Sequence, residues 1–180
     1  MREQEQVIRW ASWDGTRVET LTIGWENNGW TADGIVEAGE DSIHYAIRTD
    51  AEWNTRQFLL FRDLEDPDLW LANDGRGTWG EVNGSVRSEL RNCTDVDLVA
   101  TPFSKSLPIK RLGLPVNESI EIWTVWVDPG TLTVMPAHQR YSHLAERTWR
   151  FEALLVEFSV EFEVDEYGFV VDFPGAFRRL

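Results

Sequence analysis

The sequence predicts a mainly β protein, folded as a strongly curved antiparallel sheet, a barrel or a roll with little helix. Strand-like segments follow one another at short spacing, turn-forming dipeptides separate them, and no window has the period of a long amphipathic helix. With 180 residues, of which 42% are hydrophobic, the chain is large enough to bury a core. We therefore expect a single domain over residues 1–180.

The expected strands are separated by turns such as Asp14-Gly15 and Asp128-Pro129-Gly130. In chain order the strands cover residues 6–13, 17–25, 30–37, 42–49, 55–63, 69–72, 118–127, 131–136, 139–143, 147–153 and 154–164. Both faces of 118–127 are apolar, which predicts that other elements cover both sides of the sheet there. In 154–164 alternate residues are apolar, which predicts one dry and one wet face.

Only one short helix is expected, around residues 104–112. Ser104 or Ser106 would cap it, and Pro108 would lie in its first turn, where proline is tolerated.

The composition excludes several classes of partner. Asp and Glu number 31 and Lys and Arg 17, so the net charge is −14 and a nucleic acid or an anionic bilayer would be repelled. One cysteine forms no disulfide within the chain, and neither a signal peptide nor a transmembrane span is expected, so we predict a cytoplasmic protein. Ten tryptophans are present, and we expect about two-thirds of them in the core.

Catalytic and metal-binding signatures are absent from the sequence. It contains no Cys-x-x-Cys, His-Glu-x-x-His or Gly-x-Ser-x-Gly motif, and its three histidines do not group on one face. We therefore expect no metal, no cofactor and no catalytic nucleophile.

The segment from Cys93 to Leu112 is the hardest to explain as ordinary packing, because neither period 2 nor period 3.6 continues through it. If its first part is extended, Asp95 and Asp97 point to one side, about 6.6 Å apart. That spacing suits an acid–base pair or a cation site. The alternative, which we prefer, is that the Lys110–Arg111 pair neutralises the two carboxylates.

Two more polar clusters lie elsewhere. In a strand ending at Asp50, His44 and Arg48 share its face, and Arg56 follows after Trp53. Arginines beside an aspartate suit a sugar or phosphate head group, whereas a corner capped by Asp50 and bridged to Arg56 fits equally well. The second cluster, Gln139-Arg140-Tyr141, has no catalytic signature.

Several motifs, taken in order, resemble one known family. They are Tyr45-x-x-Arg48-x-Asp50-x-x-Trp53-x-x-Arg56, Asp74-Gly75-x-Gly77-x-Trp79, Cys93-x-Asp95-Val96-Asp97-x-x-x-Thr101-Pro102-Phe103, Leu107-Pro108-Ile109-x-Arg111-Leu112, Gln139-Arg140-Tyr141 and Val171-Asp172-Phe173-Pro174-Gly175. From about residue 7 to the end, the chain resembles the "putative glycolipid-binding" family, formerly a domain of unknown function. The resemblance implies a spiral β-roll, an incompletely closed barrel similar to bacterial lipoprotein-carrier folds.

The resemblance implies non-catalytic binding of a lipid, glycolipid or other amphiphile in an apolar groove, in glycolipid metabolism or transport. Tryptophans would line the groove, and arginines at its rim would hold the polar end. The expected ligand-binding residues are Arg48, Asp50, Trp53, Arg56, Asp95, Asp97, Thr101, Arg111, Arg140 and Tyr141. Two alternatives stay open: an enzyme that uses Asp95 and Asp97 with an arginine, and a protein-interaction module that docks through a sheet edge or an aromatic patch.

Overall fold

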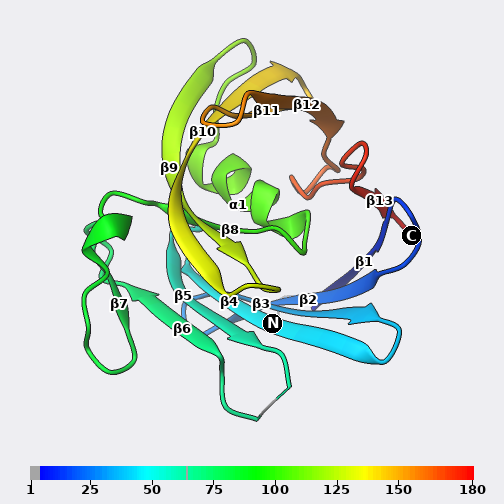
Figure 1. The fold of residues 1–180 in the computed structure, drawn as a ribbon. Helices are drawn as coiled ribbons and strands as arrows, with labels where there is room; N and C mark the ends of the chain where they lie inside the picture. Colours follow the sequence, from blue (N-terminus) through cyan, green and yellow to red (C-terminus); the bar gives the residue numbers. More distant parts are fainter. Residues whose placement is uncertain (1–4, 64) are drawn as a thin grey trace.

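The computed structural model describes residues 5–63 and 65–180, and in this part of the chain two curved sheets surround one α-helix (Figure 1). The first sheet has the order β13-β1-β2-β3-β4-β5-β6-β7 and the second the order β12-β11-β10-β9-β8. All pairings are antiparallel except β8 with β9, which is parallel. No ladder joins the two sheets within the described residues, so the predicted mainly β, incompletely closed roll is confirmed.

The element bounds follow the order of the chain. The first sheet contains β1 (Gln6–Ser12), β2 (Val18–Glu26), β3 (Gly29–Ala38), β4 (Asp41–Asp50), β5 (Thr55–Phe61), β6 (Leu69–Asn73), β7 (Trp79–Glu81) and β13 (Phe177–Arg179). The second contains β8 (Asp95–Leu98), β9 (Ser119–Asp128), β10 (Thr133–Ala145), β11 (Thr148–Ala153) and β12 (Phe158–Glu163). The helical elements are the 3-10 turn η1 (Ser88–Leu90) and α1 (Phe103–Leu112).

The strand predictions are wrong at three places, and the short strands β7 and β13 were not predicted. The two strands expected in 131–143 are one continuous strand, β10. Residues 154–157, expected in a strand, form the turn between β11 and β12, and Glu157 has a left-handed backbone there. On β9, Val125 and Val127 are buried but Trp123 is 40% exposed, so both faces are covered only toward the end of that strand.

The helix α1 begins earlier than expected, and neither Ser104 nor Ser106 caps it. The Phe103 N–H donates instead to the Thr101 hydroxyl oxygen, 3.0 Å away. Pro108 lies in the second turn and not the first. Gly113 ends the helix in the left-handed conformation, and its N–H donates to the Ile109 carbonyl.

Buried side chains form two clusters. The main cluster lies between the first sheet, α1 and β8, and includes Trp10 and Phe103. The second packs β9–β12 against the C-terminal segment, and includes Trp149. Only Trp53 and Trp79 join these two tryptophans in being buried among the described residues, so the expectation that two-thirds of the tryptophans are buried is wrong.

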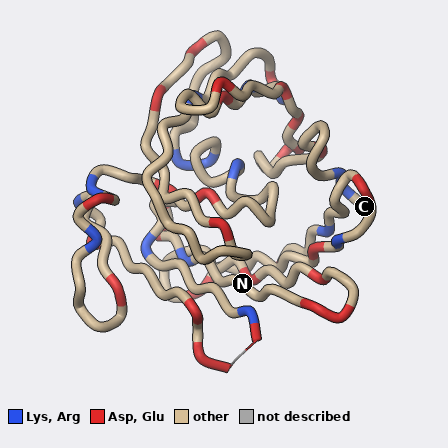
Figure 2. Tube along the Cα trace, viewed as in Figure 1, with Lys and Arg blue, Asp and Glu red and all other residues tan. Residues whose placement is uncertain are grey.

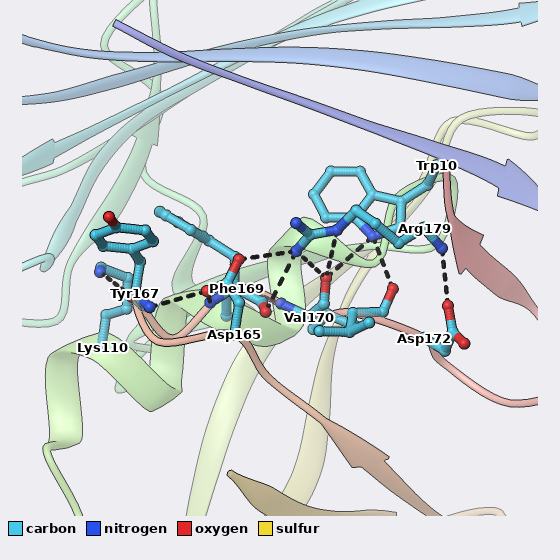
Figure 3. Close-up of polar contacts among 10 residues, drawn as sticks. Trp10, Lys110, Asp165, Tyr167, Phe169, Val170, Asp172 and Arg179 are labelled. Atoms are coloured by element: carbon cyan, nitrogen blue, oxygen red, sulfur yellow. Dashed lines mark hydrogen bonds and ion pairs between the residues drawn. The ribbon is translucent and has the colours of Figure 1, made fainter. Parts of the chain in front are cut away.

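The C-terminal segment crosses the gap between β12 and β1 (Figure 1). Arg179 fixes it, because its guanidinium donates to the carbonyl oxygens of Val170 and Phe169 and pairs with Asp165 at 3.1 Å (Figure 3). The same guanidinium lies 5.0 Å from the Trp10 ring, and the indole N–H donates to the Val170 carbonyl at 3.1 Å. These contacts tie β1 and β13 to the segment that follows the second sheet.

Replacing Arg179 with leucine should lower the free energy of unfolding by about 1–3 kcal/mol, because two buried carbonyls lose a charged donor. Urea denaturation followed by tryptophan fluorescence measures the change. The matched control is Arg178→Leu, since that neighbouring side chain is exposed. Equal losses of stability for the two substitutions would show that the Arg179 contacts do not stabilise the C-terminal segment against β1.

Candidate functional site

The polar side chains of the Cys93–Leu112 segment hold α1 against β8. The first turn of α1 contacts Asp97 and its last turn contacts Asp95, so the helix runs back along the strand inside the roll (Figure 1). Figure 2 shows the basic residues of α1 inside the roll, while acidic residues are spread over the outer turns. We call the contacts of Asp95 and Asp97 with α1 the β8–α1 tether.

Asp95 is fully buried and forms a bidentate pair with Arg111. Arg111 Nε lies 3.0 Å from Oδ1 and Nη2 lies 2.7 Å from Oδ2, and the Thr94 hydroxyl donates to Oδ2 at 2.7 Å. This is the fork geometry that suits a carboxylate. The ion pair expected between these two residues is therefore present.

Asp97 is 3% exposed and pairs with Lys105, where Lys110 was the expected partner. Ser104 Oγ donates to its Oδ1 at 3.1 Å, and Gln139 Nε2 donates to its Oδ2 at 2.6 Å. Lys110 lies about 100° around the helix from Arg111 and so faces away from β8. Its ammonium donates to the Tyr167 carbonyl at 2.6 Å (Figure 3).

An apolar cavity of about 400 Å³ lies beside the tether. Its walls come from the end of β8, the start of α1, β10, the β11–β12 hairpin and the C-terminal segment. The apolar lining consists of Leu98, Val99, Pro102, Trp126, Met135, Pro136, Ala137, Phe151, Ala153, Leu155, Val156, Phe158, Phe173, Ala176 and Phe177. The polar lining is limited to Asp97, Thr101, Lys105, His138 and Gln139. Phenylalanines and aliphatic residues thus form most of the lining, and among the described residues Trp126 is the one tryptophan in it.

Lys105 links the polar and apolar parts of this lining. Its ammonium pairs with Asp97 and lies 4.5 Å from the centroid of the Phe151 ring. The ring face attracts the cation, so the ammonium is held between a carboxylate and an aromatic wall. Both charges are largely shielded from solvent, because the side chains of Lys105 and Asp97 are 12% and 4% exposed.

A second buried polar group lies behind Thr101. The ring of Tyr45 lies against Gly34 on the neighbouring strand β3, where a Cβ atom would come 2.2 Å from the ring. The Tyr45 hydroxyl donates a hydrogen bond to the Glu19 carboxyl at 2.5 Å. The same hydroxyl lies 3.2 Å from Thr101 Oγ1. Burial raises the pKa of Glu19 to about 7, and the hydrogen bonds from Tyr45 and Thr101 lower it only in part. This group connects the first sheet to Thr101, in the loop that precedes α1.

Three of the expected site residues line a separate polar recess at the β4–β5 turn. Arg48 pairs with Glu26 at 3.2 Å on the outer face of β4. Asp50 accepts hydrogen bonds from the Asn54 N–H and side-chain amide at 2.9 and 3.0 Å, so it caps the turn. The Arg56 guanidinium lies against Gly75, where a Cβ would come 1.9 Å from Nη1, and not on Asp50. Within the part of the chain that the structure describes, the recess shares no lining residue with the apolar cavity.

The remaining expected site residues lie apart from the cavity. Trp53 is buried and stacks on Trp30 at 4.9 Å. Arg140 lies on the outer face of β10 and pairs with Glu121 at 2.6 Å. Tyr141 is 1% exposed in the second cluster. Of the ten expected residues, Asp97 and Thr101 line the cavity.

Sequence reasoning placed no binding role on Lys105 or Gln139. The sequence placed Gln139 in a polar cluster, but it predicted two short strands where the structure has β10. In the continuous strand, Gln139 and Tyr141 alternate with outward-facing neighbours and point inward. Within the described residues, no three His, Cys, Asp or Glu side chains are grouped as a metal site, and no helix is long and apolar enough to cross a membrane.

The fold and the cavity define a class of protein: an open β-roll in which two sheets and an internal helix enclose an apolar, ligand-sized space. The chain belongs to the family described as "Putative glycolipid-binding", whose model matches residues 7–179. It is similar to the crystal structure of a DUF1089 family protein from Pseudomonas aeruginosa, with a TM-score of 0.79 and 29% identity over 94% of this chain and 92% of that chain. None of the curated proteins matches the sequence.

Replacing Asp95 with asparagine should lower the free energy of unfolding by about 3–5 kcal/mol, because Arg111 would be left buried without its counter-charge. Urea denaturation measures the loss. The matched control is Asp33→Asn on the exposed face of β3, which should change stability by less than about 0.5 kcal/mol. A loss below about 1 kcal/mol for the Asp95 variant would contradict a structural role of the pair.

Glu19 should make stability depend on pH. The folded state keeps the Glu19 proton up to about pH 7, whereas the unfolded state loses it near the ordinary value of 4.5. The folded state therefore binds more protons between these values, and the free energy of unfolding should fall by up to about 3 kcal/mol as the pH rises through this window.

Replacing Glu19 with glutamine should remove that fall. Urea denaturation of the native protein and the Glu19→Gln variant from pH 4.5 to pH 8 provides the measurement. Glu37→Gln, on an exposed position of β3, controls for the loss of a carboxylate. Parallel pH profiles of the native protein and the Glu19 variant would contradict the raised pKa.

Proposed function

We propose that the protein binds a lipid, a glycolipid or another amphiphile in the apolar cavity beside the β8–α1 tether, without catalysis, in glycolipid metabolism or transport. The observation that carries this proposal is the cavity itself. Its volume of about 400 Å³ lies within the range of ligand pockets, roughly 300–1,000 Å³, and its lining is apolar except at a few positions. The description of the family supports the same class of ligand.

The energetics favour an amphiphile over a polar ligand. Each methylene that leaves water contributes about 0.8 kcal/mol, whereas association costs roughly 4–15 kcal/mol. For a ligand with a chain of about ten carbons, the free energy gained from burial exceeds the cost of association only if the cavity is already formed. Much of this wall is already packed, because Leu98, Phe151 and Phe173 are buried members of the two hydrophobic clusters.

The contacts of Asp95 and Asp97 favour binding over the enzyme alternative. Asp95 is occupied by Arg111 and Thr94, and Asp97 by Lys105, Ser104 and Gln139. These partners hold the helix in place and occupy oxygens of both carboxylates, which favours a structural role for the two side chains. A cytoplasmic location stays a prediction from the sequence.

The direct test is native mass spectrometry of the protein purified from its own host, followed by lipid extraction. A co-purifying amphiphile supports the proposal. Protein that carries no amphiphile and also fails to bind N-phenylnaphthylamine, a neutral apolar dye, would refute it.

Filling the cavity should block binding. Ala153→Phe places a ring where the cavity wall now has a methyl group, and should weaken dye binding more than about tenfold, because the space for two or more methylenes is lost. Fluorescence titration measures the dissociation constant, and urea denaturation checks that the variant is folded. The matched control is Ala72→Phe on an exposed position of β6 in the first sheet, which should bind the dye as the native protein does. Unchanged dye binding by a folded Ala153→Phe protein would place the ligand elsewhere.

A further inference from the structure

The polar end of the cavity contains a hydrogen-bond acceptor that has no donor. Gln139 is 1% exposed and lines the cavity, and its Oε1 is buried without a partner among the described residues. Four other buried side-chain atoms also lack a partner, on Glu19, Thr55, Arg62 and Thr124, but none of those residues lines the cavity. A buried acceptor without a donor is costly, so a donor from a ligand would be favoured there.

The orientation of the Gln139 amide is fixed by Asp97. Its Nε2 lies 2.6 Å from Asp97 Oδ2, and the opposite orientation would place two oxygens at that distance. Asp97 Oδ1 already accepts from Ser104 and Lys105, so this carboxylate keeps the amide nitrogen and leaves Oε1 for another donor.

The charges around the cavity disfavour an anionic head group. Lys105 and Asp97 neutralise each other, and His138 Nε2 lies 2.9 Å from Glu121 while its ring stacks on Trp123 at 4.6 Å. Among the described lining residues, an incoming carboxylate or phosphate would therefore meet a paired ammonium, a paired imidazole and the acceptor oxygens of Asp97 and Gln139. A hydroxyl is neutral and donates, which is what Gln139 Oε1 lacks.

The polarity of the cavity changes from its inner end to its mouth. The polar lining residues Asp97, Thr101 and Gln139 are at most 3% exposed. In contrast, the apolar lining residues Leu155, Val156 and Phe158, on the β11–β12 hairpin, are 62%, 73% and 47% exposed. A chain that leaves the cavity would run along this apolar mouth.

The geometry points to a neutral amphiphile that binds head first. A hydroxyl of its head group donates to Gln139 Oε1, and its alkyl chain extends toward the mouth at Leu155–Phe158. Because Oε1 is itself buried, the hydroxyl reaches it when apolar side chains of the lining shift, while Lys105 stays paired with Asp97. This inference rests on the proposed function, and it names the class as hydroxyl-bearing amphiphiles such as alkyl glycosides, monoacylglycerols or long-chain alcohols.

The experiment uses the full chain and displacement of N-phenylnaphthylamine by probes with a common ten-carbon chain. Decanol should bind about fivefold more tightly than decyl methyl ether, although the ether has one more carbon, because only the alcohol donates a hydrogen bond. Decanoate should bind more weakly than decanol at pH 8. Comparing n-decyl glucoside with decanol then distinguishes a sugar hydroxyl from a simple alcohol as the donor.

Two variants locate the effect. Gln139→Leu should bring the ratio of the decanol and ether affinities to about one, with both affinities calculated from the dye dissociation constant measured for that variant. Val156→Ser at the mouth should weaken both probes and leave their ratio unchanged. Since Gln139→Leu also removes a donor from Asp97, its folding is checked by urea denaturation, and the measurements on the native protein decide the question if it is unfolded.

The outcomes separate this inference from the proposed function. If the dye binds but decanol is no better than its ether, or decanoate is the best ligand, the head-first assignment is overturned while the lipid site stands. If no amphiphile co-purifies and neither the dye nor any ten-carbon probe binds, the proposed function fails. A preference for decanol that survives Gln139→Leu would show that another group is the acceptor.

Discussion

The rest of the structure depends on the β8–α1 tether, because it fixes the helix inside the roll. Two carboxylates and two cations removed from water would destabilise the fold if they were poorly paired. Here each carboxylate has further donors: Thr94 for Asp95, and Ser104 and Gln139 for Asp97. With the helix held in this way, its apolar side chains complete the main cluster and its Ser106 hydroxyl accepts the Val170 N–H of the C-terminal segment. The same placement leaves the space that forms the cavity.

The fold class could be predicted because the long hairpins of the first sheet have a clear period of two. On β4, Tyr45 and Ile47 are fully buried while His44 and Arg48 lie toward solvent, as the alternation predicts. Short elements carry too little pattern for this reasoning. The four residues of β8 are all buried, so they show no alternation. The apolar turn at 154–157 was mistaken for a strand because apolar residues at the cavity mouth extend the alternation of β12 beyond its end. That the chain is one domain stays a prediction.

The candidate site was harder to predict, because its walls come from segments far apart in the sequence. Asp97, Gln139, Phe151 and Phe173 meet only once the strand register and the path of α1 are known. Two of the arginines that were expected at the rim of the groove form ion pairs with carboxylates of nearby strands instead. In a chain with 31 acidic and 17 basic residues, a cation on a strand commonly finds a carboxylate across the sheet, as Arg48 finds Glu26 and Arg140 finds Glu121. The charge pattern of a sequence does not reveal whether an arginine will pair with a carboxylate of the protein or bind a ligand.

Asp97 belongs to both the tether and the cavity, and this double role constrains any ligand. Its Oδ1 holds Lys105 on α1, and its Oδ2 sets the orientation of the Gln139 amide on β10. A ligand at the inner end therefore contacts the groups that position the helix, and an anion placed there would compete with Asp97 for Lys105. A neutral head group leaves that pair intact. The requirement that the helix stay in place and the preference for an uncharged ligand thus follow from the same carboxylate.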